Sequence, residues 1–171
     1  GHAYTAIRWD GANLIGRPLP FEVVHILELL DQLRREGRLK LAKASDERLT
    51  FHDPCQIVRR GGVVEPQRNL MKLVTSNFVE MTDHGVMNWC CGGGGGVSAI
   101  ERAEPLRLKA FDRKAAQIAE VKPERLVTAC ANCRMMIEEG LEYEEIDMEV
   151  IGLAELLLEQ LDQDSAAPAP G

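Results

Sequence analysis

The chain has 171 residues, 45% of them hydrophobic, which suits one globular domain with a sizeable core. The formal net charge of −7 and the lack of a Lys/Arg block argue against a nucleic-acid-binding surface. No apolar run reaches the roughly 18 residues of a membrane-spanning helix, and five cysteines with two adjacent do not resemble a secreted disulfide framework. The sequence therefore predicts a reducing, cytoplasmic compartment and no membrane span in this chain.

The first part of the chain alternates short β-branched runs with helical patterns. FEVVH at 21–25 is typical of a strand, and apolar residues at 26–39 recur at helical spacing as far as a stop signal at Gly37. RLTFH at 48–52 predicts a second strand. The segment 65–74 predicts a helix, because a proline stands where the helix would begin.

The second part continues the alternation. Strands are expected at 77–81, 124–129 and 148–152, and helices at 104–121, 133–141 and 153–161. Four apolar residues form one stripe along the helix expected at 104–121: Leu108, Phe111, Ala115 and Ile118. Repeated strand-then-helix units predict an α/β fold with a mainly parallel sheet.

Two segments of the chain resemble each other, FEVVHILELLDQL at 21–33 and MEVIGLAELLLEQL at 148–161. One explanation is composition, since strand-plus-leucine-rich-helix units look alike. The other is that two similar domains once stood in tandem, so that residues 1–45 are the end of a preceding domain and 46–161 a complete one. The polar, Pro/Ala-rich segment 162–171 predicts a disordered tail.

Every cysteine belongs to one arrangement of a single cysteine, an adjacent pair and a C-x-x-C. The five are Cys55, Cys90, Cys91, Cys130 and Cys133. Several follow an expected strand or lie in a loop, and a parallel sheet gathers such site-forming turns at one end. Because thiolates are soft ligands, the arrangement predicts a sulfur-rich metal site that holds an iron–sulfur cluster or zinc.

The adjacent pair and the glycines after it favour the cluster. Zinc takes four ligands, whereas Cys90 and Cys91 can bind different irons of a larger cluster. The glycines that follow are Gly92, Gly93, Gly94, Gly95 and Gly96. We expect at least one to have a positive φ and the run to bring backbone N–H groups close to the cofactor. A phosphate-binding loop is the alternative, but no G-K-[ST] accompanies the run.

The segments HDPCQIVRRGG, CCGGGGG and ACANCRMMIEEG together resemble the cysteine-rich CCG domain of the heterodisulfide reductase B/D family. FVEMTDHGVMNWCCGGGGGV most resembles the K subunit of the dissimilatory sulfite reductase membrane complex and related respiratory iron–sulfur subunits. Family members commonly carry two such domains, the first ending in E-C-G-H-A, which GHAY at the start of this chain fits. The resemblance thus implies that 46–161 is a CCG iron–sulfur domain and that 1–45 ends a similar one.

The resemblance also implies a non-cubane [4Fe–4S] cluster held by all five cysteines: Cys55, Cys90, Cys91, Cys130 and Cys133. The resemblance further implies that the chain is an electron-transfer subunit of a larger redox or respiratory complex. As a heterodisulfide reductase-like component, it would have a thiol or disulfide substrate. Partner subunits would then place the chain at the inner face of a membrane, and no residue is assigned a catalytic role. The alternative is a metal-stabilised structural or docking module with zinc, a metal also expected in recombinant material.

Several further residues have a structural interpretation beside a functional one. His52 and Asp53 could shuttle a proton, or form a strand-end turn fixed by Pro54. Arg59, like its neighbour Arg60, could offset the charge of a cluster, meet an anionic substrate or be solvated. His2 is expected to be packed or exposed rather than a ligand.

Overall fold

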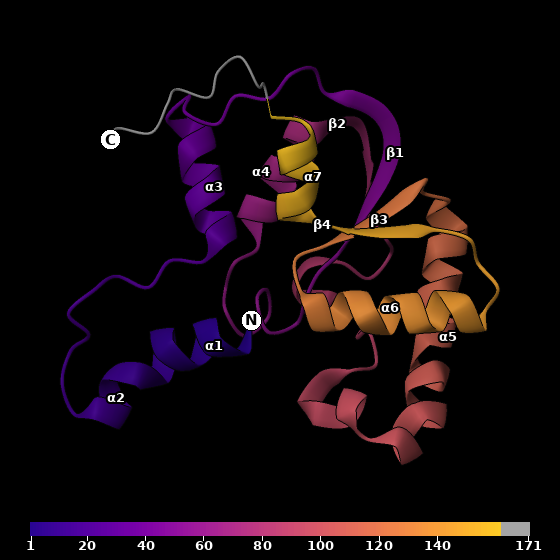
Figure 1. Cartoon of the computed structure of the whole chain (residues 1–171), viewed down its shortest axis with the longest axis horizontal. Coiled ribbons are helices and arrows are strands. Elements are labelled where there is room, and N and C mark those ends of the chain that lie inside the picture. The colour runs from indigo at the N-terminus through magenta and orange to yellow at the C-terminus, as the bar shows by residue number, and fades with distance from the viewer. Residues whose placement is uncertain (162–171) are drawn as a thin grey trace.

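A computed structural model describes residues 1–161 and has an α/β fold around one parallel sheet (Figure 1). The strands are β1 (Ser45–His52), β2 (Thr75–Val79), β3 (Arg125–Thr128) and β4 (Glu149–Gly152). They lie in the order β2-β1-β3-β4, and each neighbouring pair is parallel. The predicted fold class is confirmed. The tail expected at 162–171 lies outside the described residues.

Helices cover both faces of the sheet (Figure 1). The α4 face carries α3 (Ile26–Arg35), α4 (Glu65–Val74) and α7 (Leu153–Glu159), and the α5 face carries α5 (Glu104–Val121) and α6 (Ala131–Tyr143). Short 3-10 turns at Gly85–Met87, Gly94–Ala99 and Glu101–Ala103 join β2 to α5. Both α4 and α5 have the bounds that the sequence predicts. Within residues 1–161, none of the helices combines the length and the apolarity needed to cross a membrane.

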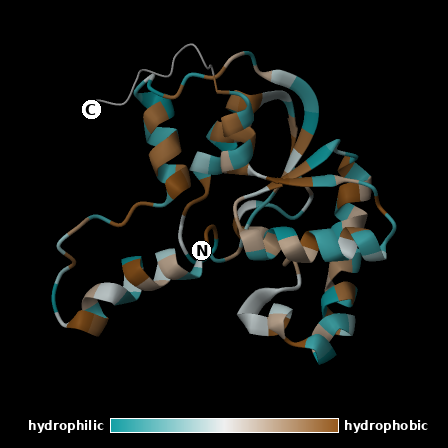
Figure 2. Cartoon of the chain, in the orientation of Figure 1, coloured by the Kyte–Doolittle hydropathy of each residue, from teal (hydrophilic) through white to brown (hydrophobic). Residues whose placement is uncertain are grey.

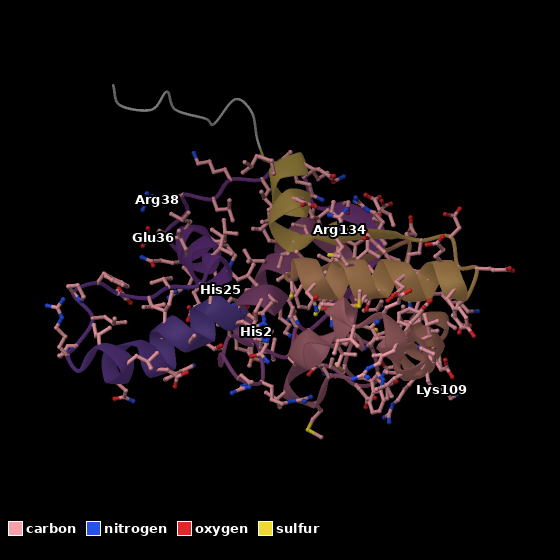
Figure 3. The ribbon with its side chains drawn as sticks, turned by 60° about the horizontal axis from the view of Figure 1, so that its bottom comes forward. His2, His25, Glu36, Arg38, Lys109 and Arg134 are labelled. Carbon is pink, nitrogen blue, oxygen red and sulfur yellow. The ribbon has the colours of Figure 1, made fainter. Side chains whose placement is uncertain are left out.

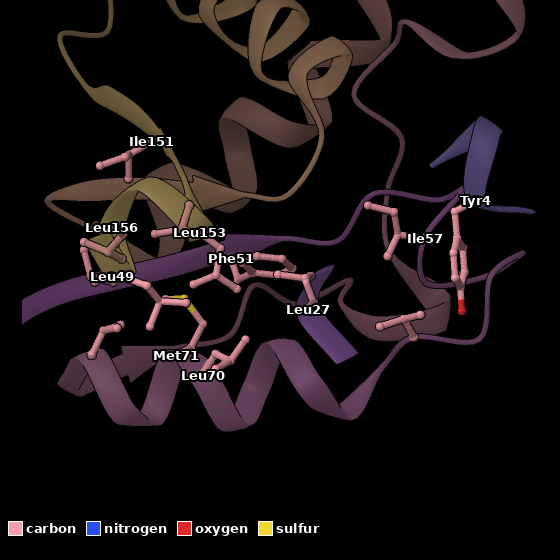
Figure 4. Packing of buried hydrophobic residues seen from close by; sticks show 14 residues of the cluster. Tyr4, Leu27, Leu49, Phe51, Ile57, Leu70, Met71, Ile151, Leu153 and Leu156 are labelled. Atoms are coloured by element: carbon pink, nitrogen blue, oxygen red, sulfur yellow. The ribbon is translucent and has the colours of Figure 1, made fainter. Parts of the chain in front are cut away.

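Strand side chains alternate between two cores, as the period of two in a strand requires. The core on the α4 face takes Leu49, Phe51, Val127 and Ile151, and Figure 4 shows part of it. The core on the α5 face takes Leu126 and Val150. Figure 2 shows hydrophobic strand residues between the two helix layers. Because both faces are buried, β3 and β4 have adjacent apolar residues at their centres, Leu126 with Val127 and Val150 with Ile151, instead of an alternation with polar ones.

The strand expected at 21–25 is wrong. The segment pairs with no other strand among the described residues and leads directly into α3. A strand needs a neighbouring backbone to satisfy its N–H and C=O groups. His25 instead caps α3: its Nδ1 accepts the Leu27 N–H at 3.2 Å, and Glu28 Oε2 accepts the His25 N–H at 2.8 Å.

The second of the two similar segments starts its helix in the same way. At the start of α7, Glu155 accepts the Gly152 N–H at 3.2 Å, in the place that Glu28 takes in α3. The two segments therefore share a helix start as well as a sequence pattern.

An N-terminal arm precedes α3 and extends away from the sheet (Figure 1). It consists of α1 (His2–Thr5), a π-helical turn (Ala6–Asp10) and α2 (Gly11–Ile15). The end of α2 is hydrophobic (Figure 2), and Leu14 there is 79% exposed. Tyr4 anchors the arm, because its buried ring packs in the α4-face core and its Oη donates to Glu28 at 2.9 Å.

The topology places a crevice between β1 and β3. From β1 the chain crosses the α4 face to reach β2, whereas from β3 it crosses the α5 face to reach β4. Parallel sheets form ligand sites outside the carboxyl ends of two strands whose connections diverge in this way. Cys55 follows β1 and Cys130 follows β3, so the fold itself brings these two cysteines together.

Candidate metal centre

The five cysteines meet at the carboxyl ends of β1 and β3. Cys55 follows β1, Cys130 is the N-cap of α6 and Cys133 lies in the first turn of that helix. Cys90 and Cys91 arrive on the loop between β2 and α5. Four of the five line one cavity of about 30 Å³: Cys55, Cys91, Cys130 and Cys133. The expectation that the cysteine-rich loops gather at one site is confirmed.

The two adjacent cysteines differ in exposure: Cys91 lies inside the site and Cys90 at its surface. Cys91 and Cys133 are buried, and their Sγ atoms are 3.4 Å apart. Cys90 is exposed and lines a neighbouring pocket of about 380 Å³ with Trp89 and Arg59. The Cys90 thiol also hydrogen-bonds to Cys91, so it joins the cavity to the surface.

The thiols hold their protons unevenly. The pKa of Cys130 is lowered to about 5, first by the hydrogen bond from the Cys133 thiol and then by backbone N–H groups at the start of α6. Hydrogen bonds from Cys133 and Cys90 lower the pKa of Cys91. The pKa values of the two donor thiols are raised by the same hydrogen bonds. Cys91 and Cys130 are therefore the thiols of this site whose lowered pKa values favour the thiolate, which is the form that binds metal.

Asp53 fixes the loop that carries the adjacent pair. Its buried carboxylate accepts both Nη groups of Arg68, at 2.5 and 2.6 Å, and the Gly85 N–H at 2.6 Å. The Asn88 side chain donates to the Asp53 carbonyl at 2.5 Å. Both carboxylate oxygens are thus engaged in structure, which supports the strand-end turn and not the proton shuttle for this residue.

Arg59 holds the same loop from another side. Its Nε donates to the Val86 carbonyl at 2.8 Å, and its Nη2 donates to both oxygens of Asn88 at 2.8 and 2.9 Å. All three acceptors are neutral. Arg59 is therefore an ordered cation beside Cys90 and not simply a solvated side chain.

The glycine run turns the chain from the cysteines towards α5. Gly92, Gly95 and Gly96 have φ values of +93°, +63° and +84°, which favour glycine. The Gly92 N–H donates to Cys90 Sγ at 3.3 Å. The predicted positive φ is confirmed, and one N–H group does reach a thiol.

Only the first residues of the glycine run lie so close to other parts of the chain that a Cβ would not fit. A Cβ at Gly93 would collide with the side chains of Met136 and Asn132 on α6. A Cβ at Gly94 would meet open space, although this residue lines the cysteine cavity. The glycines therefore serve the packing of the loop against α6 as well as the surroundings of the thiols.

His52 belongs to the site. It ends β1, is 1% exposed, and has a ring nitrogen within 4.8 Å of the Sγ atoms of Cys91 and Cys133. Its Nδ1 is buried without a hydrogen-bond partner among the described residues. A signal was present in the sequence, because the period of two places His52 on the face opposite to Phe51.

His2 also lines the cysteine cavity, and Figure 3 shows it where the N-terminal arm meets the rest of the molecule. Its side chain is exposed, as expected, but its place beside the thiols was not predicted. The position depends on a long-range contact: Gly1 packs so closely on Gln56 that a Cβ would lie 2.8 Å from the Gln56 Cβ. Sequence patterns of single elements do not reveal such a contact.

The donor set fits a thiolate-bound metal centre. Four thiols and no carboxylate line the cavity, which disfavours hard cations such as Mg²⁺ and Ca²⁺. Soft thiolates favour zinc and iron–sulfur clusters. The Sγ atoms of Cys91 and Cys133 are in contact, so a cluster would have to separate these two residues.

Comparison with known families gives one match to this region. The family model CCG, described as a cysteine-rich domain, matches residues 49–138. This range begins within β1 and contains the adjacent cysteine pair and the C-x-x-C at the start of α6.

Curated proteins with similar sequences are components of redox systems. The D subunit of dihydromethanophenazine:CoB–CoM heterodisulfide reductase from Methanosarcina acetivorans is 33% identical over 159 residues, covering 92% of this chain and 38% of the relative. EtfAB:quinone oxidoreductase from Syntrophomonas wolfei is 30% identical over 168 residues, covering 94% and 23%. The Hdr-like menaquinol oxidoreductase iron–sulfur subunit 2 of Archaeoglobus fulgidus is 30% identical over 142 residues, covering 78% and 25%. The chain therefore spans well under half the length of these relatives.

Proposed function

The chain belongs to the CCG family of cysteine-rich domains, and from that membership we propose that it is an iron–sulfur electron-transfer module of a larger redox complex. The observation that carries the proposal is the convergence of all five cysteines on one crevice of the sheet. A bound iron–sulfur cluster supplies one-electron transfer. The chain's own residues would hold that group, shield it and set its charge environment.

Within this proposal the cluster is a non-cubane [4Fe–4S] centre with five ligands: Cys55, Cys90, Cys91, Cys130 and Cys133. The unequal placement of the adjacent pair supports two ligands on different irons, because Cys91 is buried and Cys90 faces a surface pocket. Cys90 would then be the ligand nearest to a redox partner. The Gly92 N–H, which already donates to Cys90 Sγ, would stabilise negative charge on that sulfur.

The proposal also assigns the chain to an assembly. Residues 1–45 would end a preceding similar domain and 46–161 would form the CCG domain, supported by the shared caps of α3 and α7. Other subunits would deliver or remove electrons, and a thiol or disulfide would be the substrate. The Archaeoglobus relative is named as a menaquinol oxidoreductase subunit, which supports a location at the inner face of a membrane through partner subunits.

Redox spectroscopy of anaerobically purified native complex tests this function. We expect broad visible absorption that bleaches on reduction and returns on oxidation. Cys90→Ser and Cys91→Ser should each lose or convert the cluster and change its electron paramagnetic resonance signal. An unchanged signal with full iron content in either variant would remove that residue from the ligand set. A colourless but fully active complex would contradict electron transfer through this site.

A zinc-bound structural module is the second candidate, and one observation favours it. Ligand atoms of His52, Cys91 and Cys133 lie within 4.8 Å of one another, a compact group that suits one small ion. Metal analysis separates the candidates. Stoichiometric zinc without iron in material from the native host would support the structural module, whereas recombinant zinc would not, because exposed clusters are lost through oxidation.

A further inference from the structure

Lys114 is a charged side chain in the core next to the cysteines. It lies on α5 with 0% of its surface exposed, and it contacts Met81, which belongs to the same core cluster of the α5 face as Cys91. Its Nζ donates to Gln117 Oε1 at 2.8 Å and lies 3.8 Å from Met81 Sδ. An ammonium group has three protons to donate, so one neutral oxygen and one weak sulfur acceptor satisfy it poorly.

No carboxylate of the described residues forms an ion pair with Lys114. The two nearby acids are engaged elsewhere. Asp83 pairs with Arg113 at 2.6 Å and accepts from Gln117 at 2.7 Å, and Asp53 pairs with Arg68. An ammonium ion buried in this way is costly unless another anion compensates it.

The cysteine site can supply the negative charge that compensates the ammonium ion of Lys114. Burial lowers the pKa of Lys114 to about 8, against the opposing effect of Asp83, Asp53 and the thiols of Cys91 and Cys90. The ammonium form therefore predominates at neutral pH even without metal. A centre in which several thiolates bind iron carries net negative charge, which strengthens this form further.

We propose that Lys114 is the built-in counter-charge of the metal–thiolate centre and makes that centre easier to reduce. This inference rests on the proposed iron–sulfur function. Reduction adds one electron, delivered by a one-electron donor protein or by dithionite, and no bond forms or breaks in the chain. Lys114 keeps its proton throughout, so the ammonium ion offsets the added negative charge electrostatically.

Two states of the protein test the proposal, each with the variants Lys114→Met and Lys109→Met. Lys109 is the control, because it lies on the same helix but on the outer surface, where it pairs with Asp112 (Figure 3). In the cluster-loaded native complex, Lys114→Met should keep the iron content but lower the equilibrium constant for reduction about tenfold, which is about 59 mV for a one-electron couple. In the metal-free chain, Lys114→Met should raise the urea midpoint of unfolding. The control should change neither value.

The outcomes separate this proposal from the proposed function. If the wild type contains iron but Lys114→Met has an unchanged reduction potential, Lys114 is not the counter-charge. The proposed iron–sulfur function would be unaffected by that result. A lower urea midpoint of metal-free Lys114→Met would also overturn it, because the ammonium would then be satisfied by the fold itself. Wild-type complex without iron would overturn the function and the counter-charge with it. Lys114→Gln, which keeps a polar group without charge, repeats the potential measurement if Lys114→Met does not fold.

Discussion

On the α4 face of the sheet, α3, α4 and α7 cover large apolar side chains such as Leu49 and Phe51. On the α5 face, α5 and α6 cover a mixture of apolar residues with Cys91, Cys133, His52 and Lys114. Apolar packing stabilises without direction, whereas buried thiols, imidazole and ammonium each cost free energy unless a partner compensates them. The α4 face is therefore stabilised mainly by apolar packing, whereas the α5 face combines an apolar core with polar groups that a bound metal would compensate.

The largest expected loss of stability lies on the α4 face. Phe51 is 1% exposed in that core, so Phe51→Ala should lower the free energy of unfolding by about 3–5 kcal/mol. Phe21→Ala is the matched control, because Phe21 is 60% exposed, and it should change stability by less than about 0.5 kcal/mol. Urea unfolding measures both. If Phe51→Ala folded but lost its metal, the two faces of the sheet would not have separate roles in stability and metal binding.

The next effect is the pH dependence of the α5 face. The pKa of Lys114 is about 8 in the folded chain against 10.5 for an unperturbed lysine. Between these values the unfolded chain binds more protons, so the stability of the metal-free chain rises with pH, by about 3 kcal/mol in total. Urea titrations of wild type and Lys114→Met give the contribution as a difference, which removes the titration of the thiols. A difference that stays constant from pH 7 to about 11 would show that Lys114 is not destabilised by burial.

A smaller effect concerns the loop between the cysteines and α5. Gly93→Ala should cost about 1–3 kcal/mol and reduce metal content, because a Cβ there collides with Met136 and Asn132. Gly94→Ala is the control, since its Cβ meets open space. Unfolding curves and iron analysis of the two variants check the contrast. If Gly93→Ala changed stability and metal content as little as Gly94→Ala, the glycine run would be a flexible linker.

Cys91→Ser should have the smallest effect on the free energy of unfolding and the largest effect on metal content. In the metal-free chain, Cys91→Ser should change the free energy of unfolding by only about 1 kcal/mol, since the hydroxyl can replace the thiol in its hydrogen bonds. The same variant should fail to hold the cluster. A loss as large as that of Phe51→Ala would mean that the thiols are part of the stabilising core.

Local patterns predicted much of this architecture. The helix at 104–121 was predicted with its observed bounds, because its apolar stripe and Pro105 are local signals. The strand at 21–25 was not, because a strand depends on a neighbour that these residues lack. The cysteine site was predicted from spacing, and the parallel topology explains why the spacing works.

The buried polar residues were predicted less well. Lys114 lies on the same side of α5 as Phe111, Ala115 and Ile118, and helical spacing could have indicated its burial. A lysine is nevertheless expected at the surface, because burial of its charge is costly. His2 reaches the site only through the packing of α1 on the loop after β1. Such contacts depend on the whole fold.

The most direct test of the account is the iron and acid-labile sulfide content of the native complex, purified without oxygen. If all five cysteines at this crevice bind the proposed cluster, we expect about four irons and a matching amount of sulfide at this site in each chain. Comparison with Cys91→Ser in the same complex assigns the iron to this site. Wild-type complex with one zinc, no iron and no sulfide at this site would contradict the account.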